Sequence, residues 1–401
     1  MKQYWLFVLA ALQDIIFCTI DSTFANNISL DVIVVLNSFT IVLYFCLRPL
    51  LMGFWAYQAM QTNPKNCLMC SLLSSIVVGI VLIATAKVLP YLFTLTDEQR
   101  QMLSDIFMLF GFCAPIQAIA RYLQEYCIYT GKQKLVLVSA FITYIPMIVG
   151  DWIAVSLNAG AFGLRLSTEL CWFLYLVVLL PASGILKVDD KLKWKTIRHC
   201  FYVGKDSCIS QSIVRVATLF LTSMASTMGT EIYAVHSVAL GITDMAESFR
   251  EAQQSYSIIE LRDHRDNLVK QSITVLKKLI VPALLLPLGL EVALVIIMHG
   301  KVPIQDAALA TCMYSLPFFV YPLYDISAGA VVLSSVRSSS IVMSLVTAIW
   351  RICVLWILIQ IFGATIPVFG MIYFLDYLSR TVFYRIMLHR EQKLLEKGNT
   401  A

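Results

Sequence analysis

The stretch Leu174–Leu180 (LYLVVLL) is an unbroken apolar run near the middle of the chain. Strands of a membrane β-barrel alternate apolar and polar residues, and this run does not. Similar runs recur along all 401 residues, of which 59% are hydrophobic and only 14% charged. Soluble domains average about 45–50% apolar and about 25% charged residues. The sequence therefore predicts an all-α polytopic membrane protein.

Polar turns divide the apolar runs into about twelve segments, each near the roughly 20 residues that a spanning helix needs. We expect a first set of transmembrane helices at 4–24, 31–59, 67–93, 99–128, 135–157 and 162–186. We expect a second set at 200–227, 232–259, 272–298, 306–335, 340–362 and 366–388.

The two sets resemble a repeat. Ile28–Ser38 (ISLDVIVVLNS) aligns with Met228–Val238 (MGTEIYAVHSV) at an offset of 200 residues, and Pro115 and Pro317 fall in equivalent spans. Parallel six-helix halves are a common transporter plan, with the binding site between the repeats. We predict two pseudo-symmetric six-helix lobes with these parts: N-lobe 1–186, cytoplasmic basic linker 187–199, C-lobe 200–389 and cytoplasmic tail 390–401.

Basic residues gather on one side of this topology, which predicts that both termini and the central linker are cytoplasmic in an inner membrane. The net charge of +5 is thus a topology signal, and no nucleic-acid partner is expected. The basic residues on the cytoplasmic side are Lys65, Lys132, Lys134, Lys187, Lys191, Lys193, Lys195, Arg198, Arg262, Arg265, Arg337, Arg390, Lys393 and Lys397.

Signals for a metal site or an enzyme are weak. Cys67 and Cys70 form a C-x-x-C pair without a second pair or a nearby histidine, so no metal site or cofactor is expected. An intramembrane transferase would need clustered acids to hold Mg²⁺, whereas Asp189–Asp190 is a lone pair among lysines. No H-E-x-x-H or G-x-S-x-G motif occurs. The enzyme alternative is therefore disfavoured.

Several short motifs follow one another along the chain: Asp21–Phe24 (DSTF), Arg121–Gln124 (RYLQ), Gly131–Lys134 (GKQK), Asp151, Gly163–Thr168 (GLRLST) and Met228–His236 (MGTEIYAVH). Their order and spacing resemble those of the multidrug and toxin extrusion (MATE) family. The resemblance implies a V-shaped pair of six-helix lobes that exports substrates in exchange for Na⁺ or H⁺. Two positions depart from the family: Met147 stands where its N-lobe Asn lies, and Val214 or Arg215 where many members have a Glu.

Ionisable groups inside a bilayer are costly, at roughly 2.5–3.5 kcal/mol each, so we treat them as functional candidates. Asp14 and Asp21 share one face of the first helix, and Asp21, Asp151 and Thr168 have similar depth in the N-lobe. Neighbouring buried carboxylates raise each other's proton affinity. We therefore predict that these four residues form a cation or proton site. The alternative is that Asp21 caps its helix and Asp151 bonds only to backbone.

The eighth helix carries Asp244, Glu247 and Glu251 on one face, with Arg250 three residues from Glu247. Three acids facing lipid would be prohibitive, so this face is expected to line a water-filled substrate cavity. The alternative is a closed salt-bridge network with Arg215 or Arg351. Arg48, Arg215 and Asn37 are further cavity candidates, and the arginines suggest a cavity of mixed sign or an anionic group on the substrate.

Two residue pairs at i,i+4 complete the candidates. Tyr321 and Asp325 resemble a Tyr/Asp pair of Na⁺-coupled members and are predicted to bind the cation. Asp376 and Arg380 are expected to form an intrahelical ion pair.

The predicted function is cation-coupled antiport, with H⁺ favoured over Na⁺, that exports small amphipathic organic compounds from a monomer in the lipid bilayer. A flippase for lipid-linked oligosaccharides is the alternative, since Arg48, Arg215, Arg250 and Arg351 could bind a pyrophosphate.

Overall fold

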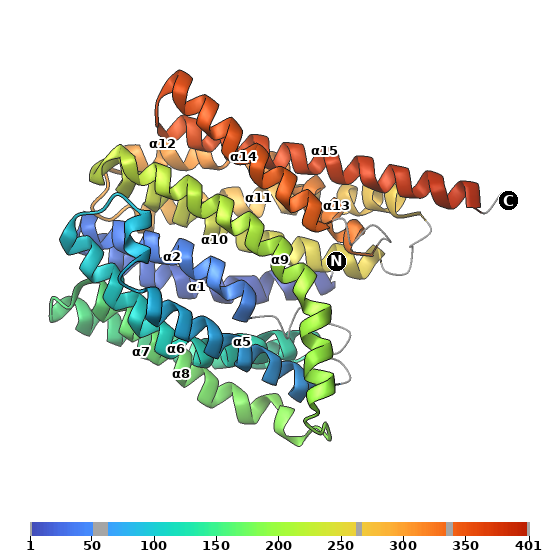
Figure 1. Cartoon of the computed structure of the whole chain (residues 1–401), viewed down its shortest axis with the longest axis horizontal. Coiled ribbons are helices and arrows are strands. Elements are labelled where there is room, and N and C mark those ends of the chain that lie inside the picture. The colour runs from blue at the N-terminus through green and yellow to red at the C-terminus, as the bar shows by residue number, and fades with distance from the viewer. Residues whose placement is uncertain (1, 51–62, 262–266, 334–339, 399–401) are drawn as a thin grey trace. The chain divides into compact units, whose positions relative to one another are not determined.

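The computed structural model describes residues 2–50, 63–261, 267–333 and 340–398, and this part of the chain is helical apart from short connections (Figure 1). The α-helices are α1 (Lys2–Ile28), α2 (Leu30–Leu50), α5 (Pro64–Thr85), α6 (Asp97–Tyr129), α7 (Gln133–Ser156), α8 (Gly160–Ser183), α9 (Trp194–Ala225), α10 (Thr230–Leu261), α11 (Leu268–Met298), α12 (Ile304–Tyr314), α13 (Tyr321–Leu333), α14 (Ser340–Phe362) and α15 (Ile366–Gly398). Short 3-10 turns lie at η1 (Leu89–Leu92), η2 (Ile185–Lys187), η3 (Ser226–Met228) and η5 (Leu316–Phe319). The expected all-α class is confirmed.

The helix ends follow from local sequence. Thr96 caps α6 in a capping box, because its hydroxyl accepts from the Gln99 N–H while the Gln99 side chain accepts from the Thr96 N–H. Gly184 ends α8 with a φ of +75°, a conformation that glycine adopts at little cost.

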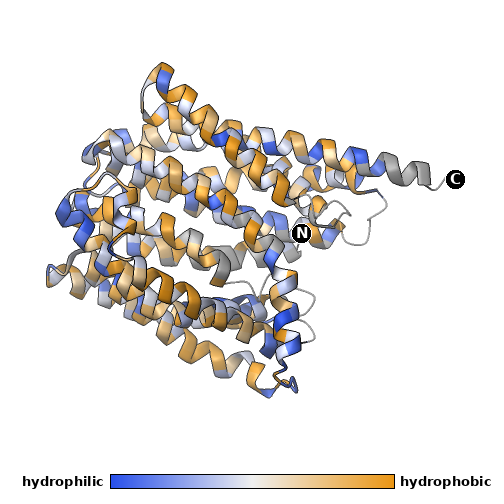
Figure 2. Cartoon of the chain, in the orientation of Figure 1, coloured by the Kyte–Doolittle hydropathy of each residue, from blue (hydrophilic) through white to orange (hydrophobic). Residues whose placement is uncertain are grey.

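Seven of the described helices are long and apolar enough to cross a membrane, and an eighth is added if the bent pair α12–α13 is one span. Their apolar residues face outward: Ile145, Trp152, Val292 and Phe362 are each more than 60% exposed. Figure 2 shows apolar residues along the helices and hydrophilic ones gathered near many helix ends. Such apolar outer surfaces fit a multi-pass membrane protein. A total of twelve spans stays a prediction.

The chain forms two compact units, residues 20–234 (unit 2) and residues 1–19 with 235–401 (unit 1). In unit 2, α5 packs on α6, α7 on α8, and α9 on α2 and α5. The α5–α6 contact requires glycine, since a Cβ on Gly79 would lie 2.4 Å from the Gly111 carbonyl oxygen. In unit 1, α15 packs on α12, α13 and α14.

These bounds differ from the expected lobes, which divided the chain at 187–199. Helix α9 belongs to unit 2, and the start of α1 belongs to unit 1, where Tyr4, Val8 and Ile15 join the core that contains Phe249 and Tyr256. The expected symmetry between the halves stays a prediction.

Candidate functional site

Three of the predicted N-lobe residues lie together in unit 2. The hydroxyl of Thr168 on α8 lies 3.1 Å from Asp21 Oδ1 near the end of α1 and 3.0 Å from the Leu164 carbonyl. Asp151 on α7 interacts electrostatically with Asp21. The structure thus brings together three side chains that the sequence placed at equal depth, while their role as a cation or proton site stays a prediction.

Among the acids of this cluster, Asp151 has the fewest polar contacts to stabilise a negative charge. Its side chain is completely buried, and neither carboxylate oxygen makes a hydrogen bond of good geometry within the described residues. The Ser167 hydroxyl is the neighbouring donor that acts on this carboxylate, and it also lies 3.4 Å from the Met147 carbonyl. A buried carboxylate with so little compensation is disfavoured in its charged form, which makes Asp151 a candidate for binding a proton or a cation.

Close packing of α7 on α8 brings Asp151 to this position. A Cβ on Gly150 would lie 2.4 Å from Ser167 Oγ, so only glycine allows the two helices to approach here. Asp151 and Thr168 each follow one of these two contact residues in sequence.

Arg165, Glu169 and Gln117 extend the cluster and were not predicted as site residues. Arg165 pairs with Glu169 one turn along α8, and Gln117 Nε2 donates to both Glu169 oxygens at 3.1 and 3.2 Å. The charges of Arg165 and Glu169 act on Asp21. Both charged residues lie inside the apolar segment expected at 162–186, and that signal could have identified them.

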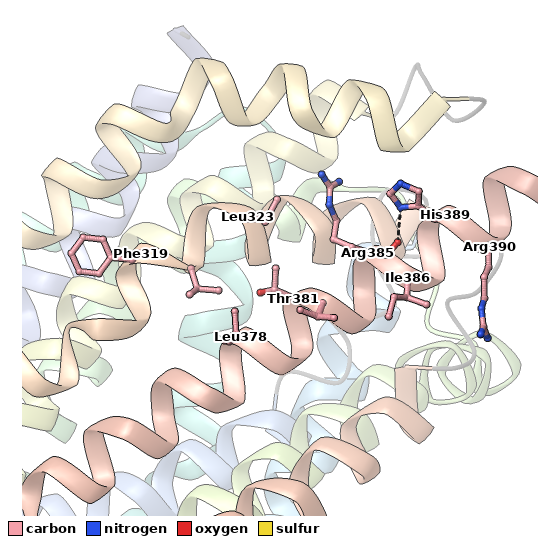
Figure 3. A pocket seen from close by; sticks show the side chains of 10 residues that line it. Phe319, Leu323, Leu378, Thr381, Arg385, Ile386, His389 and Arg390 are labelled. Atoms are coloured by element: carbon pink, nitrogen blue, oxygen red, sulfur yellow. Dashed lines mark hydrogen bonds between the residues drawn. The ribbon is translucent and has the colours of Figure 1, made fainter.

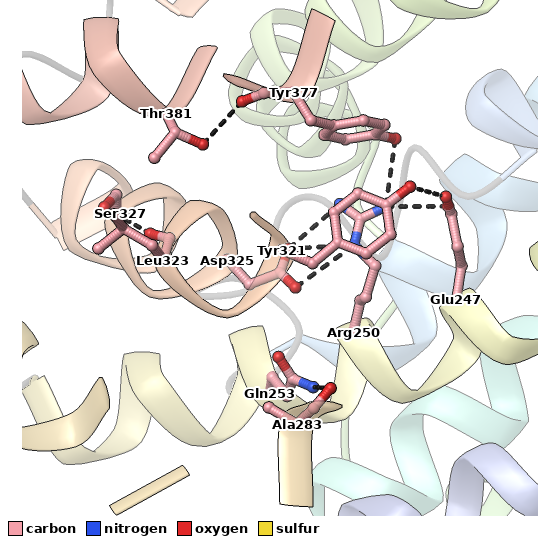
Figure 4. Close-up of polar contacts among 10 residues, drawn as sticks. All are labelled: Glu247, Arg250, Gln253, Ala283, Tyr321, Leu323, Asp325, Ser327, Tyr377 and Thr381. Carbon is pink, nitrogen blue, oxygen red and sulfur yellow. Dashed lines mark hydrogen bonds and ion pairs between the residues drawn. The ribbon is translucent and has the colours of Figure 1, made fainter. Parts of the chain in front are cut away.

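In unit 1, Arg250 on α10 is the centre of a second cluster (Figure 4). Its guanidinium lies 2.9 Å from Glu247 and 3.2 Å from Asp325 on α13, and it donates to the Tyr377 hydroxyl at 3.1 Å. The guanidinium carbon lies 3.8 Å from the centre of the Tyr321 ring. The Tyr321 hydroxyl donates to Glu247.

This arrangement changes the interpretation of Tyr321 and Asp325. Both were predicted to bind a cation, yet here both Asp325 oxygens face the Arg250 guanidinium. In this conformation a Na⁺ ion at Asp325 would have to compete with the positive charge of Arg250. The expectation that Glu247 and Arg250 line a substrate cavity stays a prediction. The ion pairs described for Glu247 are with Arg250 and not with the Arg215 or Arg351 of the closed-network alternative.

A third group contains Asp376 between two arginines. Arg380 lies 3.0 Å from it within α15, which confirms the expected i,i+4 pair, and Arg351 on α14 lies 3.5 Å away. The guanidinium of Arg351 stacks on Tyr373 at 4.7 Å. Asp376 thus balances one of the two positive charges, and the group keeps a net charge of +1 inside the helix packing.

The remaining predicted residues are placed individually. Asn37 donates to the Tyr233 hydroxyl at 3.3 Å, so it joins α2 to the start of α10. Asp244 is half-buried and acts electrostatically on Tyr373, and Arg215 is half-buried on α9. The side chains of Asp14, Arg48 and Glu251 lie outside the described residues.

Sequence reasoning also missed Glu291 on α11. It is 4% exposed, and Ser315 donates to its Oε2 at 2.6 Å. The sequence signal that could have identified Glu291 is a lone acid in the apolar segment 272–298.

Within the described ranges no three His, Cys, Asp or Glu side chains are placed to hold a metal ion.

Comparison with known proteins gives structural matches only. No family model matches the sequence, and no curated protein does. The fold is similar to the inward-facing conformation of a multidrug resistance MATE family transporter of the MOP superfamily, with a TM-score of 0.74 and 14% identity over 98% of this chain and 99% of that one.

Two further solved structures have a similar fold. A MOP superfamily transporter from Pyrococcus furiosus, described as having a reverse-polarity binding pocket that suggests a different function, gives a TM-score of 0.71 and 14% identity over 98% of this chain and 95% of that one. The MATE multidrug transporter DinF-BH, solved as a complex, gives 0.65 and 15% over 98% and 96%. This chain therefore has the fold of the MATE family transporters of the MOP superfamily.

Proposed function

We propose that this protein is a secondary transporter that exports small amphipathic organic compounds in exchange for a cation, with H⁺ favoured over Na⁺. The observation that carries the proposal is the buried Asp151 carboxylate beside Asp21 and Thr168. A buried carboxylate with so little compensation is stabilised when it is protonated or has a cation beside it. Binding and release at this site can therefore alternate during a transport cycle.

The location of Asp21 supports coupling between this site and a larger movement. The boundary between the two compact units falls inside α1, between Thr19 and Ile20, and Asp21 is the second residue after it. Protonation of Asp21 would change its bond with Thr168 at the point where one continuous helix passes from one unit to the other. Alternating access by movement of the two units would thus respond to the proton.

The same proposal includes a monomer in the cell membrane. The distribution of basic residues supports its orientation, with both termini in the cytoplasm. The flippase alternative is less well supported, because Arg250 and Arg351 are held in ion pairs with buried acids. They are therefore not available to bind a pyrophosphate.

The test uses the full chain in vesicles loaded with ethidium, a small amphipathic compound whose fluorescence reports its release. The compartment that corresponds to the cell exterior is made acidic relative to the other. We expect dye efflux that stops when a protonophore is added. Equal dye efflux from protein-free vesicles, or efflux indifferent to every imposed cation gradient, would contradict the proposal.

A further inference from the structure

A groove of about 630 Å³ lies in unit 1 between the start of α13 and the second half of α15 (Figure 3). Leu323, Val382 and Ile386 form part of its apolar wall, and Val382 and Ile386 are about half exposed. Arg385, His389 and Arg390 lie at one end (Figure 3). The groove is thus apolar along its length and basic at one end.

The length of α15 allows its basic end to be placed relative to a bilayer. Helix α15 begins at Ile366, and its 19 residues from 366 to 384 rise by about 28 Å, close to the roughly 30 Å hydrocarbon core. Its mean hydropathy is reduced by Asp376 and Arg380, which neutralise each other in a buried pair. Arg385 and Arg390 therefore begin the headgroup layer, while Leu323 and Val382 lie beside acyl chains.

The contacts described for the positive charges at this end are to neutral groups. Arg385 Nη1 donates to the neutral Ser272 hydroxyl at 2.7 Å, and His389 Nδ1 lies 2.9 Å from the Arg385 carbonyl. Within the described ranges no acid forms an ion pair with Arg385 or Arg390, whereas Arg250, Arg351 and Arg380 all have one. The two arginines lining the groove are therefore available for an external anion.

We propose that this groove binds an anionic phospholipid, with one acyl chain along Leu323, Val382 and Ile386 and the headgroup at the basic end, its phosphate beside Arg385 and within the field of the Arg390 charge (Figure 3). The shape excludes an anion without a chain as the best occupant, because most of the groove is apolar. The charge disfavours a zwitterionic lipid, because its ammonium group would bring another positive charge to an end that already carries two arginines. Basic pockets beside membrane helices are known to select anionic headgroups in this way.

Native mass spectrometry of the full-length protein, released from detergent with one added compound at a time, tests the proposal. The probes are dioleoyl-phosphatidylglycerol, dioleoyl-phosphatidylcholine and inorganic phosphate. We expect the phosphatidylglycerol to be retained preferentially. Arg385→Gln and Arg390→Gln should each weaken its binding by about fivefold, the equivalent of about 1 kcal/mol per basic residue near a membrane surface.

Three variants separate the groove from general effects. Lys270→Gln removes an exposed positive charge at the start of α11, outside the groove lining, and should leave binding unchanged. Arg385→Lys keeps the charge and should restore most of the binding. Val382→Trp fills the apolar wall and should weaken binding of both lipids. The proposal fails if the two lipids are retained equally, if Arg385→Gln binds like the unaltered protein, or if inorganic phosphate alone is retained as well as the phosphatidylglycerol.

Discussion

Asp151 and Arg250 show two ways in which single buried charges are accommodated here. Arg250 has two carboxylates and a tyrosine hydroxyl around it, whereas neither oxygen of Asp151 makes a hydrogen bond of good geometry within the described residues. A fully paired charge holds helices in one arrangement. An unpaired acid responds to whichever cation reaches it, and this difference is why we assign ion coupling to unit 2.

Replacing the acids tests this assignment directly. Asp151→Asn and Asp21→Asn each remove a titratable charge with little change in volume, so cation-driven efflux should fall to the level of empty vesicles while expression is kept. Asp97→Asn makes the same change at an exposed position and should transport normally. Normal efflux by both buried-site variants would favour the alternative in which Asp21 only caps its helix.

Arg250 should matter for stability. Arg250→Gln leaves Glu247 and Asp325 without their cation, and removing one partner of a buried ion pair costs about 3–5 kcal/mol. We expect a clear fall in the melting temperature of the detergent-solubilised protein. Adding Asp325→Asn to this variant should recover part of the loss, because it removes an uncompensated charge. Arg198→Gln, at an exposed position on α9, is the control. A double variant less stable than Arg250→Gln alone would contradict the ion-pair account.

The grouping of the site residues was partly predictable from sequence. Depth along the helices was enough to group Asp21, Asp151 and Thr168, because rise per residue is constant. It could not show that Arg250 faces Asp325, since the rotation of α13 about its axis is set by tertiary packing. Arg165 and Glu169 were missed for a related reason: their effect on Asp21 depends on how α8 meets α1.

At the scale of elements, hydrophobic runs predicted the helices well because burial in lipid is a local property of the sequence. The segment expected at 306–335 is instead α12 and α13, bent by 45° around η5. Pro317 lies in η5, and proline cannot continue the helical hydrogen bonding. The residue was visible in the sequence, but whether a proline bends or breaks a helix depends on its neighbours.

The central linker has a structural role that its charge pattern did not reveal. Asp190 Oδ2 accepts from the backbone N–H groups of Lys65 and Asn66 at 2.9 and 3.3 Å, and Oδ1 accepts from Asn66 Nδ2 at 2.7 Å. Asn63, at the N-cap of α5, makes no side-chain capping bond. The linker therefore supplies the cap of a helix more than 100 residues away in sequence.

Asp190→Ala should thus lower the free energy of unfolding by about 1–2 kcal/mol, the usual cost of losing an N-cap and its hydrogen bonds. Asp189→Ala, the exposed neighbour, is the matched control and should change stability little. Thermal unfolding of both variants in the same detergent measures the difference. Equal effects of the two substitutions would indicate that only net charge matters here.

At the scale of the whole molecule, the sequence repeat and the compact units describe different properties. The repeat concerns segments along the chain, whereas α9 joins unit 2 because it packs on α2 and α5, and residues 1–19 join unit 1 through Tyr4, Val8 and Ile15. Helices α1 and α10 both cross the boundary between the units. The assignment of α9 and of residues 1–19 to these units follows from tertiary contacts, and hydropathy could not predict it.

The coupling ion is a property of the whole cycle, and we predict that it is H⁺. Na⁺ needs several oxygen ligands in one cage, whereas a proton needs a single carboxylate whose proton affinity is raised by burial and a neighbouring acid. Met147, which stands where the MATE family has an Asn, has a buried thioether in place of an amide oxygen, so one oxygen ligand for Na⁺ is missing. Arg165 also places a positive charge near Asp21, and this charge disfavours the binding of a Na⁺ ion there.

Substrate efflux from vesicles at fixed pH, with and without a Na⁺ gradient, separates the two ions. We expect a Na⁺ gradient alone to give no efflux above background, a pH gradient alone to drive it, and Asp151→Asn to abolish the pH-driven component. Glu291 provides the comparison, because it is a buried acid of unit 1 that has no arginine partner among the described residues. If unit 2 carries the coupling, Glu291→Gln should still show efflux driven by the pH gradient. Robust Na⁺-driven efflux that persists with a protonophore would overturn the assignment, and it would point instead to Tyr321 and Asp325 after release of Arg250.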